Sequence, residues 1–245
     1  MRVLGLDTAT SATVVGLLEL APDGRELTAI ERRDDPPPGT RPRHTSALLA
    51  LAIEALDEAG VGWDELDLLA VGTGPGTFTG LRIGITTARA LAHARELPIV
   101  GVSTLRSLAS AAVAAASARG RLALAVIDAR RGEVFAASWA DSDVPGTPLI
   151  APAAVAPERL AATLAETGER WLAVGNGAVA FRQVLERSGA WVPDDGAALH
   201  RASAIAHCRL ATGLKPQNPN DVRPEYVRLP DAELTLRAGA SRATI

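Results

Sequence analysis

Apolar and polar positions along the chain predict strands first and helices afterwards. Three apolar runs, separated by short polar turns, cover residues 2–7, 13–19 and 25–31. The second turn contains Asp23-Gly24, which is a strong signal for a β-hairpin. We therefore expect the chain to begin with three antiparallel strands.

The pattern then takes a helical period. Segment 44–59 is apolar around more than the usual third of its circumference, which is typical of a helix covered on two sides. Gly60 follows it as a C-terminal cap. Strands and helices then alternate over residues 66–71, 81–95, 98–102 and 104–118. The order βββαβαβα predicts parallel pairing through helical crossovers, and a sheet with helices on its faces.

The second half, from Leu122, repeats the opening. A strand that ends in Asp128 is followed by a turn and a return strand, as is the strand that ends in Asp7. This repeat predicts an α/β protein of two lobes, an N-terminal one over residues 1–119 and a smaller C-terminal one over 120–245. The later elements are an irregular connection over 141–157, a helix to 166, a strand over 171–174, and helices over 178–187 and 202–210.

Composition excludes several classes of protein. The 245 residues are 47% hydrophobic and 22% charged, as in ordinary globular proteins. A net charge of −3 excludes the global basic field that autonomous nucleic-acid binding requires. The single cysteine, Cys208, excludes an internal disulfide and suggests a reducing compartment. With no signal-like N-terminus and no run of about 18 apolar residues, we expect a cytoplasmic protein that does not span a membrane.

A glycine-rich loop over residues 72–80 lies between a predicted strand and a predicted helix. Such a loop can hold a phosphate on the amide groups at the start of the helix. The lysine and hydroxyl of a P-loop are missing, and Pro75 removes a donor, so neither a P-loop nor a dinucleotide fingerprint fits. Phosphate contact and a purely structural turn both remain open.

The helix after this loop has a small residue at every fourth position, at Gly80, Gly84, Ala88 and Ala92. Residues four apart share one face of a helix. Each interior glycine costs about 1 kcal/mol relative to alanine, so the stripe predicts close packing against another helix. Either this chain or a partner provides that helix.

The first hairpin resembles the phosphate loop of actin/hexokinase-type ATPases, because polar residues follow the strand that ends in Asp7. Those loops normally carry a glycine where this chain has Ala9. An aspartate that bonds its own turn is the structural alternative. The glycine loop, and a second glycine pair where that fold contacts adenosine, add further candidates. The candidate nucleotide-binding residues are Asp7, Thr8, Thr10, Gly74, Gly76, Thr77, Gly175 and Gly177.

Metal-binding and nucleophilic signals are weak. His200 and His207 are two helical turns apart, roughly 10 Å, and His44 would need a partner at the position of Leu48. No metal held by this chain is therefore expected. Ser103 lacks the final glycine of a G-x-S-x-G elbow and is predicted to cap a helix.

Several segments together resemble the TsaB family, formerly YeaZ. They are residues 1–10, 43–49, 72–84, 98–109 and 127–135, with 225–228 as a late match. The resemblance is dense to about residue 140 and thin afterwards. It implies an actin/hexokinase-type (ASKHA) fold of two βββαβα-like lobes, the second reduced.

The resemblance also implies a function in tRNA modification. TsaB is a non-catalytic subunit that binds and activates its catalytic paralogue TsaD, together with the ATPase TsaE. The complex transfers a threonylcarbamoyl group to the adenosine beside the anticodon of tRNAs that read ANN codons. Contact with tRNA is expected through the complex, and ATP or ADP is expected to bind weakly or at the partner interface, if at all. The paralogue's His-x-x-x-His metal pair is reduced here to His44 and Leu48.

Dimerisation through a helical bundle is implied as well, and the chain alone is expected to form a homodimer. The expected interface residues are Leu48, Leu51, Ala52, Ala55, Gly80, Arg82, Gly84, Ile85, Ala88 and Ala92. An ATP-dependent kinase or phosphotransferase of the same fold is the alternative function, although Ala9 and the lack of a recognisable catalytic base count against it. A peptidase is disfavoured by the missing metal pair and the incomplete serine elbow.

Overall fold

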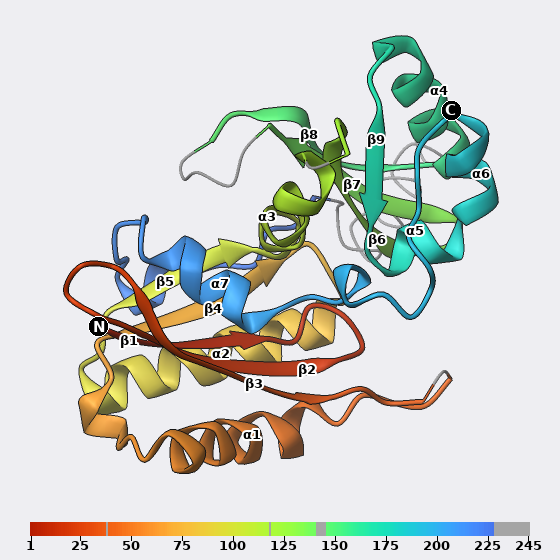
Figure 1. Cartoon of the computed structure of the whole chain (residues 1–245). Coiled ribbons are helices and arrows are strands. Elements are labelled where there is room, and N and C mark those ends of the chain that lie inside the picture. Colours follow the sequence, from red (N-terminus) through yellow and green to blue (C-terminus); the bar gives the residue numbers. More distant parts are fainter. Residues whose placement is uncertain (38, 118, 141–145, 228–245) are drawn as a thin grey trace.

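Two β-sheets with helices on their faces make up the fold in this computed structural model (Figure 1). The structure describes residues 1–227, except 38, 118 and 141–145. The first sheet has the order β3-β2-β1-β4-β5 and contains β1 (Arg2–Asp7), β2 (Thr13–Leu20), β3 (Glu26–Asp34), β4 (Leu68–Gly74) and β5 (Ile99–Ser103). The second has the order β8-β7-β6-β9 and contains β6 (Leu122–Arg130), β7 (Glu133–Trp139), β8 (Pro148–Val155) and β9 (Trp171–Val174).

The two sheets share one topology. In the first, β1, β2 and β3 pair antiparallel, while β4 pairs parallel to β1 and β5 parallel to β4. In the second, β6, β7 and β8 pair antiparallel and β9 pairs parallel to β6. Strands β6 to β9 therefore correspond to β1 to β4, and among the described residues the second sheet has no counterpart of β5. This duplicated, reduced arrangement confirms the predicted actin/hexokinase-type fold.

Helices cover both faces of the first sheet. On one face lie α1 (His44–Ala59) and α2 (Phe78–Arg95), and on the other lies α7 (Ala204–Ala211) (Figure 1). Because side chains alternate along a strand, Leu4 and Leu6 of β1 pack with α1 and α2, whereas Val3 packs with α7. Gly5 allows α7 to approach the sheet closely. A Cβ at this position would lie 2.5 Å from the carbonyl oxygen of Ala204.

The second sheet is also covered on both faces. Its helices are α3 (Thr104–Ser117) on one face, and α4 (Pro157–Thr167), α5 (Asn176–Ala180) and α6 (Arg182–Arg187) on the other. Three single turns of 3-10 helix complete the described elements, η1 (Trp63–Glu65), η2 (Ala198–His200) and η3 (Pro219–Asp221). Within the described residues, no helix is both long enough and apolar enough to cross a membrane.

Two helices pack on the sheet that lies on the other side of the predicted boundary at residues 119/120. The helix α3 follows β5 of the first sheet but packs on the second, and α7 follows the second lobe but packs on the first. Segment 217–226 also returns to the first lobe, where the Gln217 amide donates to the Ile99 carbonyl (2.8 Å). Each sheet therefore receives part of its cover from the other side of the predicted boundary. Residues 228–245, including the last residue of the 225–228 match, lie outside the described part.

Most predicted elements are confirmed, with shifts of a few residues at their ends. The helix over 44–59 and the strand over 171–174 have the predicted bounds, and Gly60 ends α1 in the left-handed conformation with φ 64°. The connection over 141–157 was predicted as irregular but contains β8, an edge strand where proline is tolerated. The predicted helix over 178–187 is interrupted at Phe181.

Candidate functional site

The turn after β1 packs directly on the glycine loop before α2. The amide of Thr77 donates to the carbonyl of Ala9 (2.8 Å), and Thr8 Oγ1 donates to the carbonyl of Gly80 (2.7 Å). A Cβ on Gly76 would overlap the backbone of Ala9, and one on Gly80 would overlap that of Thr8. The glycines therefore let two loops meet backbone to backbone, and packing within the chain accounts for them.

The small-residue stripe of α2 faces the chain's own lobe. A Cβ on Gly84 would overlap Thr8 Oγ1, while Ala88 and Ala92 pack in the core beneath the sheet. The stripe is thus covered by the β1 turn and the first sheet, and not by a helix of a partner.

Nine of the ten expected interface residues are buried within the N-terminal lobe. They are Leu48, Leu51, Ala52, Ala55, Gly80, Gly84, Ile85, Ala88 and Ala92. The tenth, Arg82, is exposed and lies over the ring of Phe78. These nine residues cover the apolar face of the first sheet, and their place at or beside a partner interface stays a prediction. The outward face of α1 instead presents Leu49 and Ile53, which are 45% and 48% exposed.

Asp7, at the end of β1, lies in the interior with 1% of its surface exposed. One carboxylate oxygen accepts from the amide of Ala9 (2.6 Å), and the other accepts from the Thr104 hydroxyl (2.9 Å). The second oxygen also lies 2.9 Å from His207 Nε2. Gly72 leaves room for this carboxylate, since a Cβ there would overlap it. Burial alone would raise the pKa of Asp7, but these partners, led by His207, outweigh it and hold the pKa below its ordinary value.

His207, on α7, is fully buried and completes this cluster. Its Nδ1 lies 2.8 Å from the carbonyl oxygen of Ser203 and 2.9 Å from Ser107 Oγ. Burial lowers the pKa of His207, whereas the bond and charge of Asp7 raise it, and the net direction is upward. The two residues therefore form a buried ion pair. Sequence spacing gave no sign of it, because the partners are 200 positions apart and belong to different elements.

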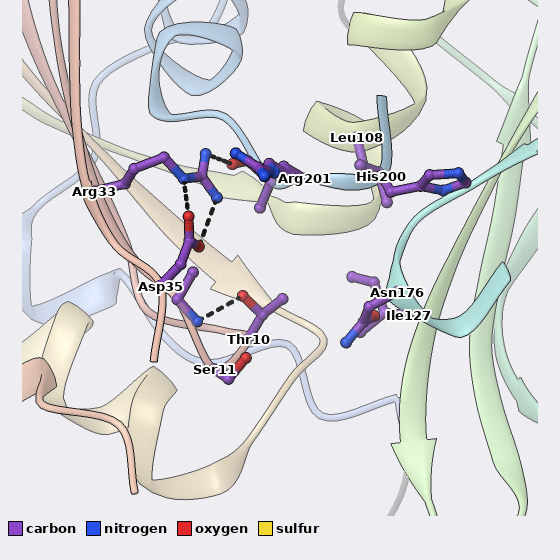
Figure 2. A pocket seen from close by; sticks show the side chains of 11 residues that line it. Thr10, Ser11, Arg33, Asp35, Leu108, Ile127, Asn176, His200 and Arg201 are labelled. Atoms are coloured by element: carbon purple, nitrogen blue, oxygen red, sulfur yellow. Dashed lines mark hydrogen bonds and ion pairs between the residues drawn. The ribbon is translucent and has the colours of Figure 1, made fainter. Parts of the chain in front are cut away.

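A small cleft of about 130 Å³ opens between the lobes, next to the β1 turn (Figure 2). Its first-lobe side is formed by the β1 turn and the end of β3, and the opposite side by parts of β6, α5 and η2. Its lining residues are Thr10, Ser11, Ala12, Arg33, Asp35, Leu108, Ile127, Asn176, His200, Arg201 and Ala202.

Arg33, in the wall of the cleft, is paired with carboxylates. Arg33 donates to both carboxylate oxygens of Asp35 (2.7 and 3.1 Å) and to Glu31 (3.1 Å). Arg33 holds the pKa of Asp35 below its usual range, against the opposing effect of burial. The ring of His200 accepts from the amide of Gly175 (3.1 Å), and its other nitrogen lies 3.0 Å from the carbonyl of Pro193. The charge of Arg33 is thus compensated, while Arg201 adds a second guanidinium to the wall of the cleft.

Of the eight candidate nucleotide-binding residues, Thr10 lines this cleft. A Cβ on Gly175 would overlap the carbonyl of Val126, and one on Gly177 would lie 2.7 Å from the backbone of Ile127. Asn176, between these glycines, does line the cleft and was not predicted. Among the other candidates, Asp7 lies in its ion pair. Thr8, Gly76 and Thr77 lie in the packed loops. The carbonyl of Gly74 accepts from the Ser103 hydroxyl (3.2 Å).

The carboxylate of Asp7 does not fit the role of a ligand to metal-bound water, because both its oxygens are bonded and buried. Nucleotide binding by this chain stays a prediction. At the start of α1, His44 Nδ1 lies 2.9 Å from Thr13 Oγ1, and burial lowers the pKa of His44. Leu48, one turn on, is in the core. In the part of the chain that the structure describes, no three His, Cys, Asp or Glu side chains are grouped to hold a metal.

Comparison with known proteins places these features in a family. A family model described as "TsaD: tRNA N6-adenosine threonylcarbamoyltransferase" matches residues 36–216. The tRNA threonylcarbamoyladenosine biosynthesis protein TsaB of Escherichia coli K12 is 33% identical over 235 residues, which cover 93% of this chain and 95% of that protein. The Haemophilus influenzae protein of the same name is 35% identical over 55% of this chain and 52% of its own length. The solved structure of YeaZ from Pseudomonas aeruginosa superposes with a TM-score of 0.72 and 29% identity, over 92% of this chain and 99% of that one.

Proposed function

Because the chain belongs to the TsaB (YeaZ) family, we propose that it acts in tRNA threonylcarbamoyladenosine biosynthesis as a non-catalytic subunit. It binds and activates a TsaD-type catalytic paralogue, and a TsaE-type ATPase joins the complex. The complex transfers a threonylcarbamoyl group to the adenosine next to the anticodon of tRNAs that read ANN codons.

The buried ion pair supports the non-catalytic part of this proposal. The fold's strand-terminal aspartate, Asp7, is bonded to His207 and Thr104 inside the protein, and is not available to a substrate. At the position where the paralogue would need a second metal ligand, this chain has the core residue Leu48. The reacting groups would therefore come from the partner.

The proposed docking of the paralogue rests on the outward face of α1. Leu49 and Ile53 are four residues apart, so they share one face of the helix, and Ala50 is exposed beside them. The inner face of α1 is already occupied by the core of the lobe. Two large aliphatic side chains left half exposed on one helix face are typical of a surface that a second helix covers. We propose that a helix of the catalytic paralogue covers it.

Co-purification tests this function. A tagged TsaD-type paralogue from the same organism should retain the wild-type chain, whereas Leu49→Arg and Ile53→Arg should weaken retention at least tenfold, because each places a charge in an apolar contact. Leu149→Arg is the matched control, since Leu149 is 52% exposed on β8 of the other lobe. Full retention of both α1 variants would contradict the proposed interface.

Reconstitution then tests the activity. Threonylcarbamoyl transfer to an unmodified tRNA transcript should require this chain in addition to the paralogue, the ATPase and the adenylate-forming enzyme. Transfer at the same rate without this chain would contradict a role as an activating subunit.

The alternative, an ATP-dependent kinase, is favoured by one observation, the cleft between the lobes with Thr10 and Asn176 in its wall. Hydrolysis of Mg-ATP by the purified chain without a partner would support it. We expect no such turnover, since Asp7 is engaged with His207.

A further inference from the structure

Phe78 and Tyr226 form an exposed aromatic pair at the start of α2. Their exposed fractions are 45% and 43%, and of the exposed large apolar side chains in the described residues these are the aromatic ones. The ring centroids lie 5.9 Å apart with 24° between the planes, which is a stacked arrangement. The guanidinium of Arg82 lies 3.8 Å from the centroid of Phe78. Planar groups from two distant parts of the chain are thus brought together at the surface.

The backbone holds this pair in place. Segment 217–226 runs antiparallel to α2. Near the end of α2, Arg89 donates to the side chain of Asn220 (2.9 Å). Before the start of α2, the amide of Glu225 donates to the carbonyl of Thr73, beside the glycine loop (2.7 Å). Tyr226 follows directly after this last bond. An ordered aromatic pair loses less conformational entropy on binding than a mobile one.

The two elements that carry the pair also carry arginines, in a chain whose net charge is −3. Arg82 and Arg223 are exposed, Arg89 is half-buried, and no carboxylate of the described residues forms an ion pair with any of the three. Glu225, on the same segment, is half-buried, and burial raises the pKa of its carboxyl. The exposed carboxylate of this segment is that of Asp221.

We propose that this face, made of Phe78, Tyr226 and Arg82, with Arg89 about 16 Å further along α2 and Arg223 three residues before Tyr226, binds an unpaired base and the adjoining phosphates of an RNA. Exposed aromatic rings and guanidinium planes stack on bases of any sequence, and arginines without carboxylate partners take phosphates. A buried aliphatic interface between proteins would not need the guanidinium on the ring or the unpaired arginines. The proposal rests on the proposed function, in which the RNA is a tRNA with unpaired loop bases.

Fluorescence anisotropy with two labelled RNAs tests the site. The probes are a single-stranded ten-nucleotide oligoadenylate and an unmodified tRNA transcript with an ANN-reading anticodon, each titrated with the full chain alone and with its complex with the catalytic paralogue. A blunt RNA duplex of ten base pairs is the control for charge without unpaired bases. The variants are Phe78→Leu, Tyr226→Ala, Tyr226→Phe and Arg82→Ala, with Leu149→Ala as the matched surface control.

Tyr226→Ala should weaken binding of the oligoadenylate by about fivefold or more, whereas Tyr226→Phe, which keeps the ring, should leave it within twofold. Arg82→Ala should reduce the slope of log K against log salt by about 0.7, the value for one phosphate on a single strand. If Phe78→Leu fails to fold, the exposed Tyr226 still decides the outcome. Equal binding by the wild type and Tyr226→Ala, equal affinity for duplex and single strand, or no measurable binding by the wild-type chain or complex would each overturn the proposal.

Partner retention measured on the same variants separates this inference from the proposed function. We expect Tyr226→Ala to remain bound to the paralogue while it loses RNA affinity. Loss of the paralogue with unchanged RNA affinity would instead make this face a protein contact and overturn the proposal. Failure of the wild type to bind the paralogue, with base binding intact, would overturn the proposed function alone.

Discussion

The imidazole of His207 and the carboxylate of Asp7 lie 2.9 Å apart in the interior, where neither side chain has more than 1% of its surface exposed. The pair joins the end of β1 to α7, the helix that returns from the second lobe. Thr104, at the start of α3, donates to the same carboxylate. One buried cluster therefore connects the first sheet to the two helices that cross between the lobes.

Removing either charge of this pair should destabilise the fold. Asp7→Asn and His207→Gln each leave the partner buried without its opposite charge, which costs about 3–5 kcal/mol. Urea unfolding followed by circular dichroism measures the loss. Asp128→Asn is the matched control, because Asp128 ends the corresponding strand β6 but pairs with the exposed Arg130, and it should cost less than about 1 kcal/mol. Equal effects at the two sites would contradict the importance of the buried pair.

Stability should fall as the pH rises above about 6.5 and passes the raised pKa of His207. The folded chain raises the pKa of His207 above its ordinary value of about 6.5, so the pair stabilises fully below that value and loses its effect as the pH passes the raised pKa. Asp7 acts in the opposite sense, since its lowered pKa stabilises above about 3.9 and this effect disappears at lower pH. Unfolding free energies measured across pH should show this decline in the wild type. The same decline in His207→Gln would assign it to another group.

Alanine at Gly80 should destabilise the protein even though alanine favours helices. Helix propensity alone would give a gain of about 1 kcal/mol, but the added Cβ would overlap the carbonyl of Thr8. We expect a net loss of about 1–3 kcal/mol in chemical unfolding. At Gly196, which has open space around it, the same change should stay within about 0.5 kcal/mol. A stabilised Gly80→Ala variant would mean that the two loops are not in contact.

The isolated chain should self-associate through the outward face of α1. Leu49 and Ile53 are half exposed there, and an uncovered apolar face of this kind favours a symmetric dimer. Light scattering after gel filtration should give the mass of a dimer for the wild type and of a monomer for the variant with both Leu49→Arg and Ile53→Arg. A dimer that survives both changes but dissociates with a substitution elsewhere would move the contact to another face.

Cys208 should be unreactive while the protein is folded. Its side chain is fully buried, with Sγ 3.4 Å from the carbonyl of Val3, and burial raises the pKa of the thiol. An aromatic disulfide reagent at pH 8 should react at the rate of unfolding, and fully only in urea. Rapid reaction of the native protein would show that α7 detaches from the first sheet.

Several features of the fold were predictable because they depend on local geometry. The helical period of residues 44–59 and the left-handed cap at Gly60 follow from side-chain spacing and from the conformational freedom of glycine. The repeat of a strand, an aspartate and a turn at Asp7 and Asp128 predicted the duplicated lobes. Local motifs also sufficed to identify the family.

The candidate sites were less predictable, because burial depends on what covers each face. The stripe from Gly80 to Ala92 correctly indicated close packing, but the sequence does not say whether a sheet, a hairpin or a partner lies against it. The same uncertainty placed Leu48 and Leu51 at a surface, whereas their neighbours Leu49 and Ile53 are the exposed ones.

By itself, the sequence determined most of the strands and helices, the two-lobed repeat and the family, since each is encoded within short stretches of chain. The tertiary structure alone decided that α3 and α7 exchange lobes, that Asp7 pairs with His207, and that Phe78 stacks on Tyr226. These contacts join residues far apart along the chain. They form only when both sheets are covered on both faces, and no local periodicity records which helix provides each cover.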